Sequence, residues 1–99
     1  MKGRNPTAEE KRHMAKVSSI GCIACLNMGY NTPPEYTLIH HCEGKTKPDA
    51  HFKVLPLCDR HHSRYYKTGL HYNKRQWEKE HGTERELMEQ VRDILERIG

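Results

Sequence analysis

The turn from Leu57 to His62 holds the residue types in this chain that most readily take part in chemistry. Cys58 is followed three residues later by His61, which is the spacing of half a zinc site. His62 comes directly after His61 and must therefore point somewhere else. We predict that this turn joins two metal sites, one structural and one catalytic.

A second pair of possible metal ligands lies upstream. Cys22 and Cys25 form a CxxC motif after Gly21, which lets the backbone turn sharply, and two thiolates at this spacing can bind one zinc ion. A lone CxxC is also the signature of thioredoxin-like redox proteins. The redox interpretation needs a βαβ setting, and none is visible in the sequence, so we favour metal binding.

The four cysteines could instead pair as disulfides, in three ways. No secretory apolar segment precedes them, because residues 1–16 are polar and charged, and the cytosol keeps thiols reduced. No apolar run approaches the roughly twenty residues of a membrane span. We therefore expect a soluble cytoplasmic protein with no membrane partner, in which Cys42 is a small apolar residue rather than a ligand.

Two further histidines, His40 and His41, end a predicted β-strand that begins at Tyr36. Adjacent residues on a strand point to opposite faces, so both can be ligands only if the strand bends or ends there. One of them is available for another role. A second strand over residues 51–55, ended by Pro56, would complete a β-hairpin with a long connection.

Helices are predicted on both sides of this hairpin. Thr7 and Glu10 match a capping box that opens a helix over residues 8–18. After the hairpin, Asp59 can cap a helix through Tyr66 that carries His62 on its first turn. The sequence therefore predicts that one short helix presents the second histidine of the turn.

The C-terminal third is expected to support the site. Asn73 can cap a helix over residues 74–80 that ends at Gly82, where an imidazolium at His81 would interact favourably with the helix dipole. A second capping box from Thr83 opens a helix to Ile98. Its apolar face can pack on the domain or bind a second copy or a partner, and we favour the first, with a monomer. The face consists of Leu87, Met88, Val91, Ile94, Leu95 and Ile98.

Composition explains why a metal would be needed. The chain has 99 residues, 34% hydrophobic residues and a mean hydropathy of −1.00. A chain of this size buries only roughly two-thirds of its unfolded surface, so the core is thin and a metal or disulfide staple is expected. We predict one α+β domain, with a basic arm and helix over 1–20, a core over 21–82 and a C-terminal helix over 83–99.

The charge balance is mildly basic, with 17 Lys and Arg against 13 Asp and Glu and a net charge of +4. Such a balance is compatible with nucleic acid binding, although solvated surface charge explains any single residue equally well. The cations that would hold a phosphate backbone surround the histidine-rich middle of the chain. They are Lys45, Lys47, Lys53, Arg60 and Arg64.

These motifs together resemble the HNH endonucleases, whose shared unit is a ββα fold around one metal ion. The matching pieces are the histidine pair, Cys22-x-x-Cys25 and Cys58-x-x-His61-His62, with His61 in place of the usual second cysteine. More narrowly, residues 21–82 resemble the phage recombination-enhancement nucleases of the Ref type. That resemblance is carried by Lys47-Pro48-Asp49-Ala50-His51-Phe52, Leu55-Pro56-Leu57-Cys58, Leu70-His71 and Trp77-Glu78-x-x-His81-Gly82.

The resemblance implies two metal sites. Cys22, Cys25, Cys58 and His61 would form a closed structural zinc site. His40 and His62 would bind a second, catalytic divalent ion (Zn²⁺, Mg²⁺, Mn²⁺ or Ni²⁺), with His41 as the general base. Its third ligand is either His71 or His51, which stands near the position of the family's middle asparagine and could instead orient the base.

The function implied is a metal-dependent DNA endonuclease with little sequence specificity, acting in a bacterial host cell. The Ref type further implies phage or prophage recombination and cleavage of DNA coated by a RecA filament. The competing class is a non-catalytic zinc-binding module that contacts DNA or a protein. The two classes differ over whether His40, His41 and His62 act together.

Overall fold

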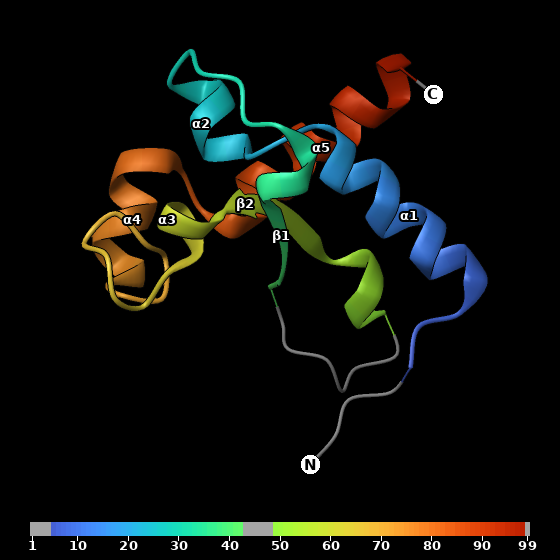
Figure 1. The fold of residues 1–99 in the computed structure, drawn as a ribbon, viewed down its shortest axis with the longest axis horizontal. Helices are drawn as coiled ribbons and strands as arrows, with labels where there is room; N and C mark the ends of the chain where they lie inside the picture. Colours follow the sequence, from blue (N-terminus) through green and yellow to red (C-terminus); the bar gives the residue numbers. More distant parts are fainter. Residues whose placement is uncertain (1–4, 43–48, 99) are drawn as a thin grey trace.

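A two-stranded antiparallel sheet lies at the centre of the molecule (Figure 1). The computed structural model describes residues 5–42 and 49–98. Strand β1 (Thr37–His41) pairs with β2 (Val54–Cys58), so that His40 lies opposite Leu55 and Thr37 lies opposite Cys58. The hairpin therefore carries a histidine pair at one end and Cys58 at the other.

The second strand is shifted relative to the sequence prediction, and Pro56 lies within it rather than ending it. Cys42 N donates to the Lys53 carbonyl at 3.0 Å, so these two residues form a hydrogen-bonded pair. Hydrogen-bonded and non-hydrogen-bonded pairs alternate along an antiparallel ladder, and Ile39 and Pro56 therefore form a non-hydrogen-bonded pair. Pro56 therefore gives up no ladder hydrogen bond to β1. The prediction that Pro56 stops the strand was wrong because a proline is tolerated at such a position.

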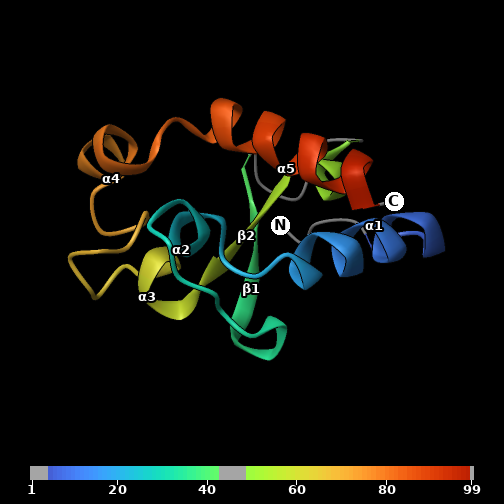
Figure 2. The same ribbon diagram turned by 90° about the horizontal axis from the view of Figure 1, so that it is seen from above.

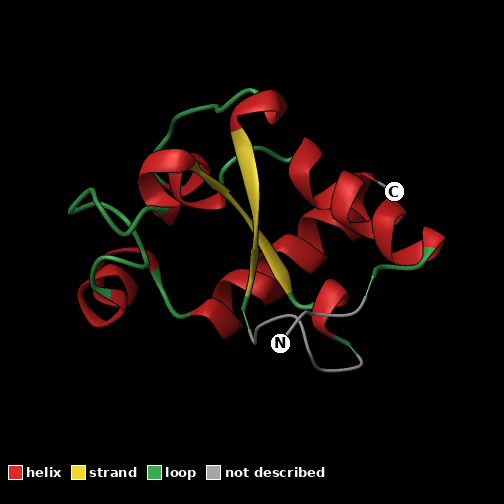
Figure 3. Ribbon diagram, turned by 60° about the horizontal axis from the view of Figure 1, so that its bottom comes forward, coloured by secondary structure: helices red, strands yellow, loops and turns green. Residues whose placement is uncertain are grey.

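Five α-helices and two 3₁₀-helices surround the hairpin in the described part of the chain (Figure 3). The predicted capping boxes are confirmed, because Glu10 N donates to Thr7 Oγ1 at 3.2 Å and Glu86 N donates to Thr83 Oγ1 at 3.1 Å. The elements are α1 (Ala8–Ser19), α2 (Ile23–Asn27), η1 (Pro34–Tyr36), η2 (Ala50–Phe52), α3 (Asp59–His62), α4 (Lys74–His81) and α5 (Glu84–Ile98).

Three local predictions around the site are corrected. Helix α3 ends at His62, because Ser63 is already extended, and it does not continue to Tyr66. Its N-cap is Cys58, which makes no side-chain cap bond, and not Asp59. His51 lies in η2, outside β2. The early end of α3 leaves residues 63–73 as the connection to α4.

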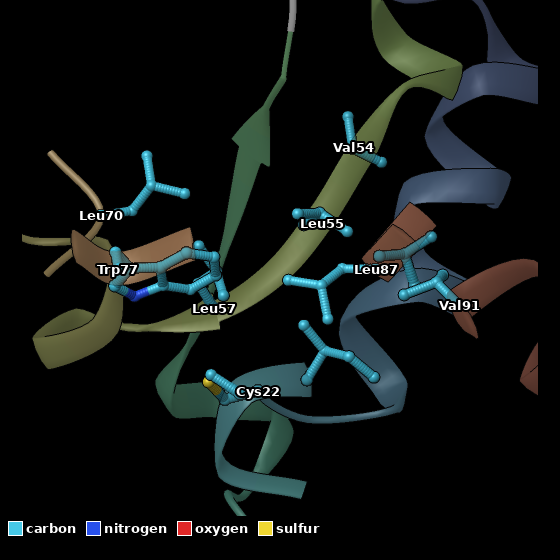
Figure 4. Close-up of a cluster of buried hydrophobic side chains, with 11 residues drawn as sticks. Cys22, Val54, Leu55, Leu57, Leu70, Trp77, Leu87 and Val91 are labelled. Atoms are coloured by element: carbon cyan, nitrogen blue, oxygen red, sulfur yellow. The ribbon is translucent and has the colours of Figure 1, made fainter. Parts of the chain in front are cut away.

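The hydrophobic core is built around β2, whose residues Val54 to Leu57 are all buried. Leu87 and Val91 of α5 approach from one side and Trp77 with Leu70 from the other (Figure 4). Helices α3 and α4 lie at one end of the molecule and α1 at the other (Figures 1 and 2). The fold is thus a small α+β unit, as predicted. Within the described residues, no helix has the length and apolarity needed to cross a membrane.

Candidate metal centres

Three cysteines and one histidine from separate elements converge on one point. The Sγ atoms of Cys25 and Cys58 are 3.8 Å apart. His61 Nδ1 lies 3.1 Å from Cys58 Sγ, 3.4 Å from Cys25 Sγ and 3.5 Å from Cys22 Sγ. These four residues are the set predicted from the sequence, and they can hold a metal ion such as zinc.

The distances within this cluster fit a tetrahedral zinc ion. Bonds of about 2.3 Å to sulfur and about 2.05 Å to nitrogen at tetrahedral angles would separate two sulfurs by about 3.8 Å and a sulfur from a nitrogen by about 3.6 Å. The observed separations lie within about half an ångström of these values. The geometry and the donor set therefore both suit zinc.

Backbone geometry places the CxxC motif. Gly21 adopts a φ of +85°, and a Cβ atom there would lie 2.5 Å from the Thr32 carbonyl oxygen. Any residue other than glycine at this turn would therefore force the backbone to move. Cys22 then caps α2, and its sulfur accepts a hydrogen bond from Cys25 N at 3.4 Å. Burial raises the pKa of the Cys22 thiol to about 12, so a thiolate here requires a bound cation.

Three histidines form a second group at the end of the hairpin. The ligand atoms of His40 on β1, His62 on α3 and His71 after it lie within 4.8 Å of one another. His62 Nε2 is 3.2 Å from His71 Nε2, close to the roughly 3.3 Å that two nitrogens take on a tetrahedral zinc ion. Burial, followed by the charges of His71 and His40, lowers the pKa of His62 to about 4, which favours the neutral ligating form.

The other two candidate site histidines form a pair of their own. His41 Nε2 lies 3.1 Å from His51 Nδ1, and their ring centroids are 5.1 Å apart. His40 and His41 thus have different neighbours, as adjacent residues on a strand should. His71 is the third member of the group with His40 and His62, whereas His51 is placed against His41.

Sequence reasoning missed Glu84, which joins the histidine group from α5. Its carboxylate lies 2.6 Å from His40 Nε2 and 2.6 Å from Lys74 Nζ, and Glu84 is buried. Burial raises the pKa of Glu84, but the hydrogen bonds from His40 and Lys74 outweigh this effect and lower it to about 2. The only sequence signal was an acidic residue in the first turn of a helix, which the helix dipole also explains.

His81 lies in the last turn of α4, as the sequence predicted, but its ring is packed inside the molecule. Its side chain is 8% exposed, and its ring centroid lies 4.8 Å from that of Trp77 and 5.1 Å from that of His61. Burial lowers the pKa of His81, which favours the neutral imidazole. The residue therefore packs against a ligand of the Cys–His cluster.

Three of the five predicted DNA-binding cations lie in the described part of the chain. Lys45 and Lys47 lie outside the described residues. Lys53 Nζ is 3.2 Å from Asp49 Oδ2, and Lys53 lines a groove between η2 and α5. Arg60 and Arg64 are exposed on and directly after α3. Of the three described cations, these two come from the segment that also carries His62.

The hairpin, the short helix after it and the two groups of cysteine and histidine ligands define a small α+β protein equipped to hold metal ions. Residues 6–96 match the model of a family described as recombination enhancement, RecA-dependent nuclease. This match covers most of the chain, so the chain belongs to that nuclease family, whose members are hydrolases that act on DNA in a RecA context. The predicted resemblance to the recombination-enhancement nucleases is confirmed.

Proposed function

We propose that this protein is a metal-dependent DNA endonuclease of the HNH class. The observation that carries the proposal is the convergence of His40, His62 and His71 at the end of a β-hairpin, with the His41–His51 pair beginning at the next residue of β1. Imidazoles suited to hold a divalent ion and a separate imidazole suited to move a proton are the two parts that phosphodiester hydrolysis requires.

The catalytic ion would be held by His40, His62 and His71. When bound, it supplies a Lewis acid that stabilises the charge developing on the scissile phosphate and on the departing oxygen. A ligand set of imidazoles favours Zn²⁺, Mn²⁺ or Ni²⁺ over Mg²⁺. Glu84 accepts from His40 Nε2 and would fix the orientation of that ring.

His41 would act as the general base that takes a proton from the attacking water. A neutral imidazole carries one protonated and one basic nitrogen. If His41 donates from Nε2 to His51 Nδ1, its own Nδ1 carries the lone pair that accepts the proton. His51 would then hold the tautomer and the ring orientation of the base, in the way an orienting group does in other acid–base sites.

DNA would be held by its backbone. Arg60 and Arg64 beside the histidine group, together with Lys53 and with Lys45 and Lys47 of the hairpin connection, would contact phosphates rather than base edges, so low sequence specificity is expected. Family membership further supports DNA coated by a RecA filament as the substrate in phage or prophage recombination. We propose that the protein acts as a monomer.

The test is a nicking assay on supercoiled plasmid with Zn²⁺, Mn²⁺, Mg²⁺ or Ni²⁺, with and without RecA and ATP. Replacing His41 by Ala should lower the cleavage rate by roughly 10² to 10⁴-fold, the usual contribution of a general base. Metal content and melting temperature should not change, because His41 lies outside both ligand groups.

His13→Ala is the matched control, since His13 is a partly buried histidine on α1, outside both ligand groups. This control should cut at the parental rate. Cleavage by His41→Ala at the parental rate would show that the base is wrongly assigned. DNA binding by the parent without cleavage under every condition would instead identify a non-catalytic zinc-binding module.

A further inference from the structure

All five tyrosines of this protein are exposed. Aromatic rings normally dominate the burial of a small core, yet here the core holds Trp77 and excludes every tyrosine. Tyr65 is 85% exposed and Tyr66 is 49% exposed, and both lie in the connection between His62 and His71. Two large rings are thus presented to solvent between two residues of the histidine group.

The segment that carries these rings, residues 63–69, is held closed by its own hydrogen bonds, and we call it the tyrosine loop. Ser63 Oγ accepts from Tyr65 N at 2.8 Å and from Tyr66 N at 3.2 Å, and Gly69 N donates to the Tyr66 carbonyl at 2.9 Å. A Cβ atom on Gly69 would lie 1.9 Å from the Ser63 carbonyl oxygen, so the two ends of the loop are in contact. The rings therefore project from a constrained backbone, which lowers the entropy cost of binding.

Cations surround the tyrosine loop. The Arg60 guanidinium lies 5.7 Å from the centroid of the Tyr66 ring, within the range of a cation–π contact. Arg64 and Lys67 are exposed on either side of the two tyrosines. Exposed aromatic rings interleaved with positive charge are the combination that binds single-stranded nucleic acid, because bases stack on the rings while the cations hold the backbone.

The tyrosine loop lies close to the histidine group along the chain. Tyr65 comes three residues after His62, so their Cα atoms are at most about 11 Å apart. This distance is spanned by roughly three stacked nucleotides at 3.4 Å each. The connection between α3 and α4 protrudes from the edge of the molecule (Figures 2 and 3), where a strand can reach it.

We propose that the tyrosine loop stacks unpaired bases beside the histidine group, so that the preferred DNA is single-stranded or locally unpaired next to the cleaved bond. Base faces in a duplex are covered by their neighbours, so an exposed ring can stack only on a base that has left the helix. The inference deepens the proposed nuclease function and rests on it for the position of the cut. Stacking itself is measured independently of cleavage.

The experiment measures binding of the full-length protein, with no divalent ion added, to a fluorescently labelled oligothymidine and to a labelled duplex of the same length. Tyr65→Ala and Tyr66→Ala should each weaken binding of the single strand by roughly fivefold to a hundredfold, the usual effect of removing one stacking ring. Duplex affinity should change by less than about twofold. Tyr65→Phe keeps the ring and should bind as the parent does.

Tyr30→Ala is the matched control, because Tyr30 is 63% exposed but lies outside the tyrosine loop. It should bind both DNAs as the parent does. Equal losses for the single strand and the duplex, or no loss for either, would overturn the inference. Selective loss of single-strand binding in a protein that cuts no DNA would keep the inference on stacking and reject the nuclease proposal.

A second measurement uses photocrosslinking of an oligonucleotide that carries 5-bromodeoxyuridine. Crosslinks at Tyr65 or Tyr66, identified by mass spectrometry of the parent protein, are expected. Crosslinks confined to other residues would contradict stacking on the tyrosine loop. This measurement needs no substitution and so does not depend on the folding of any variant.

Discussion

At the scale of single residues, the contact between Glu84 and His40 matters most for metal binding. A histidine that ligates a metal usually donates its other ring nitrogen to a carboxylate, which fixes the tautomer and raises the basicity of the ligand. Glu84 lies 2.6 Å from His40 Nε2, and Lys74 holds the other carboxylate oxygen at 2.6 Å. The carboxylate is therefore positioned from both sides before any metal binds.

Replacing Glu84 by Gln tests this role, because glutamine has nearly the same size but no charge. The affinity of the protein for the catalytic ion should fall roughly 10- to 100-fold, as it does when such an outer carboxylate is lost. Titration of protein stripped of the catalytic ion, with Mn²⁺ or Zn²⁺ as the probe, measures the effect. Zinc bound by the Cys–His cluster should stay constant.

Glu89→Gln is the control, because Glu89 is an exposed acid on the same helix. It should bind the catalytic ion as the parent does. Equal affinities in Glu84→Gln and the parent would show that the carboxylate does not orient His40.

At the scale of elements, the placement of α2 depends on Gly21. Two glycines near α2 have positive φ, Gly21 at +85° and Gly29 at +90°. A Cβ atom at Gly21 would collide with the Thr32 backbone, whereas at Gly29 no atom lies within 4 Å. A side chain would strain the backbone at either position, but only at Gly21 would it also collide with a neighbouring segment.

Gly21→Ala and Gly29→Ala form a matched pair for this reason. Gly29→Ala should lower the free energy of unfolding by about 1 to 2 kcal/mol through backbone strain. Gly21→Ala should cost about 1 to 3 kcal/mol more, because Thr32 has to move, and it should also weaken zinc binding by displacing Cys22. Urea denaturation and competition with a zinc chelator measure the two effects. Equal losses of stability in both variants would show that the collision is relieved at no cost.

The helices could be predicted from their capping residues, whereas the position of β2 could not be predicted as well because it depends on pairing with β1. Thr7, Asn73 and Thr83 bind the backbone within three residues of themselves, so local sequence suffices to place α1, α4 and α5. The position of β2 depends instead on its register with β1. Periodicity alone cannot supply that register, which is why the strand was placed about three residues too early and Pro56 was taken as its end.

At the scale of the whole molecule, the Cys–His cluster joins elements that are distant in the sequence and that also meet in the hydrophobic core. It ties α2 to the end of β2 and the start of α3, and Cys25 and Cys58 lie 33 positions apart in the sequence. His61 belongs to this cluster and His62 to the histidine group, so one peptide bond links the two candidate metal centres. Disorder at the first centre should therefore displace the second.

Cys58→Ala should remove zinc, abolish cooperative thermal unfolding and disable cleavage, although Cys58 is not expected to contact DNA. The free energy of zinc binding in such sites, roughly 10 kcal/mol or more, exceeds the typical stability of a small domain. Circular dichroism during heating, together with metal analysis, measures the loss. Treating the parent with a strong zinc chelator should have the same effect.

Cys42→Ala is the matched control, since Cys42 is a partly buried cysteine outside the Cys–His cluster, with its sulfur within 4.8 Å of ligand atoms of His40 and Glu84 instead. It should keep the zinc ion of the Cys–His cluster and unfold cooperatively. A metal-free Cys58→Ala protein with parental melting behaviour would show that the cluster does not stabilise the fold.

The sequence by itself determined which side chains are available for metal binding, because ligand type and short spacing are local properties: the CxxC motif, Cys58 with His61, and the adjacent His40 and His41. Only the tertiary structure decided which of them meet. His71 rather than His51 joins His40 and His62, and Glu84 reaches His40 from 44 residues away. Such long-range contacts depend on the register of the hairpin and on how α5 packs against it, and neither leaves a periodic trace along the chain.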